Sequence, residues 1–258
     1  MSNVDWNAVA YDNIADPMFE WGVANIAKLE LKGNERVLDA GCGSGRVTEE
    51  LLKRLPSGEA VALDFSPQMM EQARQRLSKL GAHVEFVEAS LQEFALERPV
   101  DGVFSNAVFH WVPDHAMMFR SLHRAVKPGG WLVAEFGGVG NLAKTLQRAQ
   151  FVAKAAPFAA HIKEFEAGPH FEDVASTRQR MEAAGFTVDE AELCIRLPRF
   201  ELRERYEMFL QTVILRQPMA ELPESLRPEF LEQVSRMTLQ EEGAYIFDYV
   251  RLNVRATA

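Results

Sequence analysis

The residues best suited to bind a charged ligand stand together near position 40. Asp39 precedes three glycines, Gly41, Gly43 and Gly45, which alternate with small residues before a helical pattern begins. Glycine is needed where the backbone takes a positive φ or where a ligand approaches without a Cβ in the way. A second acid, Asp64, follows 19 positions after Gly45, and an acid about 20 positions beyond such a turn typically holds a ribose. The spacing therefore predicts a site for a nucleoside-containing cofactor.

The glycine spacing also indicates which nucleoside. It reads G-x-G-x-G, whereas the dinucleotide fingerprint is G-x-G-x-x-G with a pyrophosphate on the helix N-terminus. A carboxylate at Asp39 would repel a pyrophosphate and suits a cationic or hydroxyl-rich ligand, which disfavours a nicotinamide oxidoreductase. These residues resemble the first motif of the class I S-adenosylmethionine (SAM)-dependent methyltransferases. The resemblance implies that Asp39 and the glycine-turn backbone hold the methionine part of SAM and that Asp64 binds both ribose hydroxyls.

The stretch 101–114 is a second match, because it resembles the fourth-strand motif of the trans-aconitate methyltransferase-like group. Ligands of doubly wound folds bind outside the carboxyl ends of strands. By this resemblance Asn106 and Ala107 line the methionine part of the cofactor, while His110 and Trp111 face the methyl acceptor. The resemblance extends over the first 141 residues and loosely over 248–252, whereas 142–243 match only in outline.

The adenine end of the site is less well defined by the sequence. Phe65 and Met69 either pack on the adenine or belong to the core. Where relatives usually carry an acid for the adenine amino group, this chain has Ser90-Leu91, a departure that leaves the contact to Ser90 or to backbone groups. The N-terminal aromatic segment of the family folds over the cofactor, which puts Tyr11 near the sulfonium, where a ring face favours a cation.

Methyl transfer depends chiefly on alignment, since positioning alone can supply roughly 7–11 kcal/mol. A carboxylate acceptor requires no base, whereas a phenol, amine or carbon acceptor would use His110 as one, because its pKa lies near working pH. Recognition of an anionic acceptor would use cationic residues after position 190, although these residues could equally be solvated surface charges. The same region is rich in apolar side chains that form either an apolar acceptor site or a helical core. The cationic residues are Arg196, Arg199 and Arg216, and the apolar ones are Phe151, Phe158, Phe165, Phe171, Met208 and Met219.

Composition restricts the partners. The 258 residues include 28 basic and 37 acidic ones, for a net charge of −9, and no Lys/Arg cluster, which argues against a nucleic-acid substrate. Two cysteines give neither a disulfide framework nor metal spacing, so no metal is expected. No apolar stretch of about 18 residues and no signal-peptide pattern occur, which predicts a cytoplasmic protein without a membrane partner. The sequence leaves the oligomeric state open.

Alternating strand and helix patterns predict the architecture. Expected strands cover 36–40, 59–64, 83–88, 100–105, 131–136, 186–193 and the end of 245–254. Expected helices cover 46–55, a segment capped by Ser66 and closed by Gly81, 114–126, 173–184, the stretch around 206–214 and 225–238. In the last strand Val250, Leu252 and Val254 alternate with Arg251 and Asn253.

We therefore expect a doubly wound, Rossmann-like, seven-stranded and mostly parallel sheet with an antiparallel edge strand and helical cap insertions. The whole chain, 1–258, forms one methyltransferase domain: N-terminal lid helices (1–30), a SAM-binding core (31–140), cap insertions (141–243) around the strand 186–193, and a final strand (244–256).

The predicted function is SAM-dependent methyl transfer to a small-molecule acceptor, with a carboxylate as the first candidate and S-adenosylhomocysteine as the product. The predicted catalytic residues are His110 and Tyr11. The alternatives are a C- or N-methyltransferase of an apolar metabolite and, because of Ser90, a SAM-binding regulatory protein without transfer activity.

Overall fold

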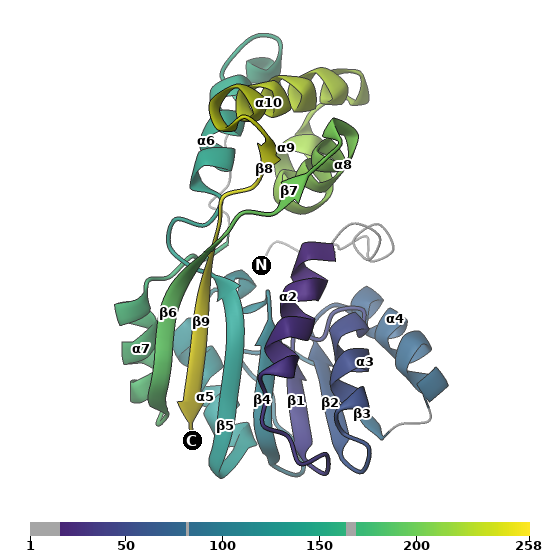
Figure 1. Ribbon diagram of the computed structural model, residues 1–258, viewed down its shortest axis with the longest axis vertical. Helices are drawn as coiled ribbons and strands as arrows, with labels where there is room; N and C mark the ends of the chain where they lie inside the picture. Colours follow the sequence, from purple (N-terminus) through teal and green to yellow (C-terminus); the bar gives the residue numbers. More distant parts are fainter. Residues whose placement is uncertain (1–15, 81–82, 164–168) are drawn as a thin grey trace.

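A computed structural model describes residues 16–80, 83–163 and 169–258. Its centre is a seven-stranded sheet in the order β3-β2-β1-β4-β5-β9-β6 (Figure 1). Six strands run parallel, and β9 runs against them between β5 and β6. The predicted mostly parallel sheet with antiparallel pairing at one edge is thus confirmed. The strands are β1 (Arg36–Ala40), β2 (Glu59–Asp64), β3 (Val84–Glu88), β4 (Val100–Asn106), β5 (Val126–Gly137), β6 (Thr187–Arg196) and β9 (Tyr249–Thr257).

Helices cover both faces of this sheet (Figure 1). One face carries α2 (Asp16–Ala27), α3 (Arg46–Lys53) and α4 (Pro67–Leu77), and the other carries α5 (His115–Ala125) and α7 (Val174–Ala183). All five residues of β1 are buried, as expected for a central parallel strand with both faces covered. Residues 16–27 are the described part of the predicted lid helices, and residues 1–15 lie outside the described residues.

Local signals set several of these boundaries. Ser66 caps α4 by accepting a hydrogen bond from Met69 N (3.4 Å), and a proline occupies the first turn, as predicted. The expected closure at Gly81 lies outside the described residues. The segment 127–130 ends α5 as expected, yet it belongs to β5, which begins at Val126. The register against β4 shifts there, because Gly129 (φ 77) bends the strand as a bulge does.

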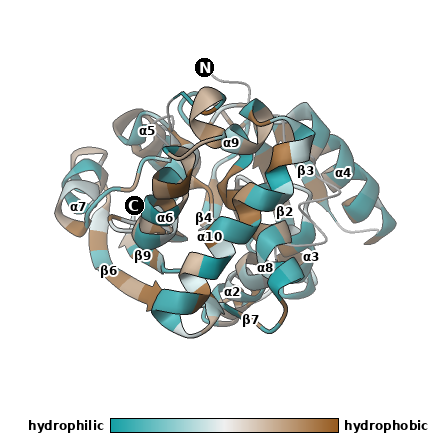
Figure 2. Cartoon of the chain, turned by 90° about the horizontal axis from the view of Figure 1, so that it is seen from above, coloured by the Kyte–Doolittle hydropathy of each residue, from teal (hydrophilic) through white to brown (hydrophobic). Residues whose placement is uncertain are grey.

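Inserted segments form a cap over the carboxyl ends of the parallel strands (Figures 1 and 2). Its interior is aromatic: Tyr206 stacks on Phe247 with ring centroids 4.3 Å apart, and Phe158 and Met219 lie in the same buried cluster. Phe158 and Met219 therefore belong to a helical core, whereas Phe151 and Met208 are exposed and Phe165 lies outside the described residues. The cap comprises α6 (Ala143–Ala153), α8 (Arg203–Phe209) with a π-helical turn (Leu210–Ile214), α9 (Arg216–Glu221), α10 (Arg227–Glu242), β7 (Arg199–Phe200) and β8 (Tyr245–Ile246).

Short 3-10 turns complete the described secondary structure. They are Ser78–Leu80, Phe109–Trp111, Phe158–Ala160 and Glu224–Leu226.

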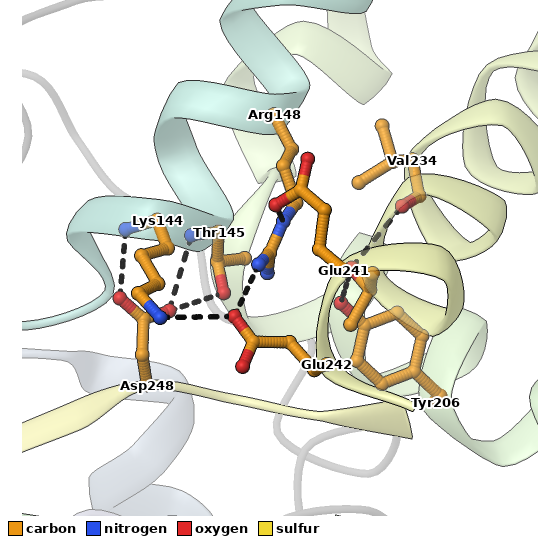
Figure 3. A network of polar contacts seen from close by, with 9 residues as sticks. Lys144, Thr145, Arg148, Tyr206, Val234, Glu241, Glu242 and Asp248 are labelled. Atoms are coloured by element: carbon orange, nitrogen blue, oxygen red, sulfur yellow. Dashed lines mark hydrogen bonds and ion pairs between the residues drawn. The ribbon is translucent and has the colours of Figure 1, made fainter. Parts of the chain in front are cut away.

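A polar network ties the cap to the strand that returns to the sheet (Figure 3). Asp248, just before β9, accepts hydrogen bonds from the backbone N of Lys144 (2.7 Å) and from Oγ1 of Thr145 (2.6 Å) at the start of α6. Lys144 and the buried Arg148 both pair with Glu242 at the end of α10. The first turn of α6 thus gains a carboxylate partner for its exposed N–H groups, and two cap helices are held to β9.

Candidate cofactor and acceptor site

The glycine turn joins β1 to α3 at the carboxyl edge of the sheet. Gly41, Gly43 and Gly45 have φ of 86°, 54° and 78°, a region that disfavours side chains. A Cβ at Gly41 would lie 2.4 Å from Val108, so this glycine is required by packing. Within the described chain a Cβ at Gly43 would meet nothing within 4 Å. Gly43 therefore leaves open the space that a close ligand needs.

Asp39 lies beneath this turn and is fully buried. Its Oδ2 accepts a hydrogen bond from Oγ1 of Thr48 at 2.6 Å, a neutral partner. Burial, with a further contribution from the charge of Asp64, raises the pKa of Asp39 to about 7. A buried carboxyl held by a hydroxyl favours a cationic ligand, because a positive charge restores its ionised form. This fits the methionine part of SAM.

Asp64 ends β2 and points back to the same turn. Its Oδ2 accepts a hydrogen bond from Gly43 N (3.0 Å), and its Oδ1 accepts one from Ser66 N (2.9 Å). Burial raises the pKa of Asp64, while these backbone hydrogen bonds oppose the shift. Each carboxylate oxygen can accept a second hydrogen bond, so two ribose hydroxyls can be bound without displacing the backbone.

The predicted adenine contacts differ in exposure. Phe65 is 53% exposed at the end of β2 and can offer its ring to a base, whereas Met69 is buried in the first turn of α4. Ser90 is exposed and accepts a hydrogen bond from Gln92 N (3.2 Å), and Leu91 is buried.

Asn106 and Ala107 end β4 in a bent conformation. Ala107 has φ of 62°, which is costly for a residue with a Cβ, and its N–H donates to the Glu135 carbonyl at 2.7 Å. Asn106 Nδ2 donates to the Met18 carbonyl on α2 (2.9 Å). Its Oδ1 is buried without a hydrogen-bond partner among the described residues. This acceptor fits an ammonium donor of the cofactor.

His110 lies in the 3-10 turn after β4, and its hydrogen bonding defines its tautomer. Nδ1 accepts a hydrogen bond from Gly137 N at 3.1 Å, so the neutral ring carries its proton on Nε2. Burial, and then the charge of Arg251, hold the pKa of His110 well below its usual value. Rings of Trp111 and Phe171 lie 5.2 and 5.8 Å from it. The ring is therefore a neutral hydrogen-bond donor. The predicted partner Tyr11 lies outside the described residues.

The structure also shows a buried charge cluster at the end of β5, which the sequence did not predict as part of the site. Arg251, which the alternating pattern counts among polar strand residues, is 1% exposed, because β9 lies inside the sheet and α2 covers this end. Its Nε donates to Glu135 Oε1 (3.3 Å), while Glu135 Oε2 accepts from Asn25 Nδ2 (3.0 Å) and lies 3.6 Å from an Arg196 nitrogen. The acid after the apolar run 131–134 was a usable signal for Glu135. Its partners are too distant in sequence to be inferred.

Two negative findings apply to the described ranges. They contain no group of three His, Cys, Asp or Glu side chains placed to hold a metal ion. Among their helices, none has the length and apolar character needed to cross a membrane.

Comparison with known proteins agrees with this geometry. The family described as "Methyltransferase domain" matches residues 37–130. The trans-aconitate 2-methyltransferase of Methylobacterium nodulans is 35% identical over 187 residues, which cover 72% of this chain and 70% of that protein. The enzymes of the same name from Methylobacterium radiotolerans and Azoarcus sp. are 35% and 36% identical, and the matches span 59% and 50% of their lengths.

Solved structures share the fold at low identity. A cyclopropane synthase of Mycobacterium tuberculosis has a TM-score of 0.61 at 16% identity, covering 93% of this chain and 83% of the other. The phosphoethanolamine N-methyltransferase 2 of Haemonchus contortus, solved with S-adenosylmethionine, has a TM-score of 0.62 at 20% identity, covering 97% and 56%.

The sheet order, the glycine turn and the two acids at its carboxyl edge define a class I SAM-dependent methyltransferase, an enzyme whose cofactor is SAM. Within that class the chain belongs to the trans-aconitate 2-methyltransferase-like family.

Proposed function

We propose that this enzyme methylates a carboxylate oxygen of a small molecule. The observation that carries the proposal is the hydrogen bond from Gly137 N to His110 Nδ1. It occupies the lone pair that a general base would use and leaves an N–H on the other nitrogen. A primary or secondary amine, a phenol or a carbon acceptor must lose a proton to give the methylated product, whereas a carboxylate needs no base. The names of the relatives, which carry trans-aconitate as their acceptor, support the same class.

We assign the cofactor-binding residues from their positions around the glycine turn. Asp39, the backbone of the turn, and Asn106 with Ala107 hold the methionine part, and Asp64 holds the ribose. Phe65 and Met69 contact the adenine ring, and Ser90 and Leu91 lie at its amino edge. When bound, S-adenosylmethionine supplies a methyl group that the nucleophile takes as the carbon–sulfur bond breaks, which leaves S-adenosylhomocysteine.

The residues on the acceptor side then position an anion. The Nε2–H of His110 donates a hydrogen bond to the acceptor, and the ring stays neutral. The positive charge of Arg251, which also acts on His110, favours a carboxylate there. Because the carboxylate oxygen carries no proton, the new carbon–oxygen bond forms without proton transfer to the protein. Tyr11 is proposed to lie near the sulfonium.

The product's chemistry tests this proposal. The purified protein is incubated with methyl-labelled SAM and with trans-aconitate, a simple amine or a phenol, and products are analysed by mass spectrometry before and after mild alkali. We expect label in a product of trans-aconitate that alkali releases as methanol, since esters hydrolyse and N- or C-methyl groups do not. Label that appears with the amine or phenol and resists alkali would contradict the proposal.

A further inference from the structure

A cleft of about 620 Å³ lies where the cap meets the sheet. Its walls come from the first turns of α2, from the end of β6 and from the chain that leads through β7 into α8. Figure 1 shows β6 rising past the start of α2 into the cap. Three arginines and two glutamates line the cleft, namely Arg196, Arg199, Arg205, Glu20 and Glu201. The balance is cationic in a chain whose net charge is −9.

Arg196 forms the inner part of this cleft and has an incomplete set of partners. One of its terminal nitrogens lies 3.6 Å from Glu135 Oε2, which is a long distance for a charge-assisted hydrogen bond. Its Nε is buried and has no hydrogen-bond partner among the described residues. Glu135 is also the partner of the buried Arg251. Arg196 thus shares this carboxylate with Arg251 and keeps a buried, unpaired donor, which favours an anion.

The outer part of the cleft carries two further positive charges at the protein surface. Arg199 on β7 and Arg205 on α8 are exposed, and in the described ranges neither has a carboxylate within ion-pair distance. By contrast, Arg203 on the same helix faces Glu207 and Glu232, each at 3.6 Å, and does not line the cleft. The two exposed arginines that line the cleft thus have no carboxylate partner among the described residues, whereas Arg203 has two.

Arg196, in the wall of the cleft, is linked through Glu135 to residues that we assign to the reacting end of the cofactor. The Glu135 carbonyl accepts the N–H of Ala107, which we assign to the methionine part, at 2.7 Å. Two residues further along β5, Gly137 N donates to His110. Glu135 therefore connects the Arg196 wall with both the cofactor side and the acceptor side.

We propose that Arg196, with Arg199 and Arg205, forms a subsite for a second carboxylate of the methyl acceptor, separate from the carboxylate that is methylated. The acceptor then carries at least two carboxylates, and Arg196 is a specificity-determining residue. This inference rests on the proposed carboxylate methylation. Arginine suits such a role because its planar fork matches a carboxylate in bidentate fashion.

The test compares two probes on the complex with S-adenosylhomocysteine. Trans-aconitate has three carboxylates, whereas crotonate keeps a double bond and only one carboxylate. Calorimetric Kd values are measured for wild type, Arg196→Gln, the double variant Arg199→Gln/Arg205→Gln, and Arg203→Gln as the matched control. We expect Arg196→Gln to weaken trans-aconitate binding at least about tenfold and the double variant about threefold. The Kd values for crotonate and for SAM, and all values for Arg203→Gln, stay within twofold of wild type.

The outcomes separate this inference from the proposed function, because binding is measured without turnover. Arginine-dependent binding of trans-aconitate without ester formation would leave the subsite standing and overturn carboxylate methylation. Ester formation with an unchanged KM in Arg196→Gln and in the double variant would overturn the subsite alone. Wild type that binds neither trans-aconitate nor citrate would also overturn it. If Arg196→Gln fails to fold, the Kd of the double variant Arg199→Gln/Arg205→Gln for trans-aconitate decides, because both of its substituted residues are exposed.

Discussion

Replacing Asp39 by asparagine is expected to stabilise the folded protein near and above neutral pH and to weaken its binding of SAM. Asparagine keeps the shape of the side chain and can still accept the hydrogen bond from Thr48. It removes only the charge that burial disfavours. A residue that costs stability while it serves ligand binding is a common feature of functional sites.

The magnitude follows from the pKa of Asp39, which burial raises from 3.8 to about 7. Between these two values the folded protein holds a proton that the unfolded chain has released, so stability falls as pH rises through this window and is level above it. Each pKa unit corresponds to about 1.4 kcal/mol, which gives about 4 kcal/mol above pH 7. Between pH 6 and pH 8, the stability advantage of Asp39→Asn over wild type should grow by about 1.4 kcal/mol.

Ligand binding should show the opposite trend. A cationic ligand prefers ionised Asp39, whose fraction in the free protein rises from about a tenth at pH 6 to about nine tenths at pH 8 for a pKa of about 7. Wild-type affinity for SAM should therefore improve about tenfold over this range, while the affinity of Asp39→Asn stays flat. At pH 8 the variant should bind about ten- to 150-fold more weakly, since a hydrogen bond to a charged group contributes roughly 1.5–3 kcal/mol.

The assay is urea denaturation and calorimetric SAM titration at pH 6, 7 and 8, with Asp101→Asn as the control. Asp101 receives hydrogen bonds from Lys127 and from the backbone of Arg36, and its pKa is lowered. The stabilising contribution of ionised Asp101 is fully present above its unfolded pKa and is lost only as pH falls through its folded pKa. Asp101→Asn should therefore be less stable than wild type by the same amount at pH 6, 7 and 8, and it should bind SAM normally. A stability difference between wild type and Asp39→Asn that is constant from pH 6 to pH 8 would refute the reasoning.

Three further predictions concern the same site. Asp64→Ala should weaken SAM binding at least about tenfold, because charge-assisted hydrogen bonds to the ribose are lost. The control Ser66→Ala loses a helix cap worth about 1 kcal/mol and should destabilise the protein without weakening SAM binding. Equal calorimetric Kd values for SAM in wild type and Asp64→Ala would remove Asp64 from the ribose site. Gly43→Ala should impair SAM binding, because the added Cβ enters the open space of the turn, and should lower the thermal midpoint modestly, because alanine is strained at a φ of 54°. Gly41→Ala should unfold more easily still, because its Cβ would also overlap Val108; the reverse order in thermal melts would contradict this. His110→Ala should bind SAM normally and transfer methyl groups more slowly. Its pH–rate profile between pH 6 and 9 should run parallel to that of wild type, because the wild-type ring is already neutral there. A wild-type inflection near pH 6.5 that the variant lacks would show instead that His110 acts as a general base.

Local signals in the sequence were sufficient for the cofactor half of the fold. Strands β1 and β2 have the predicted bounds, since short apolar runs that end in an acid or a glycine are set by neighbouring residues alone. The cap at Ser66 follows from the Ser-Pro pair in the same way. The bulge at Gly129 was not predictable, because whether a Pro-Gly-Gly segment leaves a strand or bends within it depends on what pairs beside it.

The sequence by itself thus determined the glycine turn, the positions of Asp39 and Asp64 at the ends of their strands, and the family, because turn chemistry and periodicity act over a few residues. Tertiary structure alone decided what the acceptor side can do. The neutral donor form of His110 depends on an N–H 27 positions away, and Glu135 meets Arg251 across 116 positions. The same chain packing buried Arg251 inside the sheet and brought Arg196 to the cap cleft. Such contacts depend on which strands become neighbours, and spacing along the chain carries no record of that.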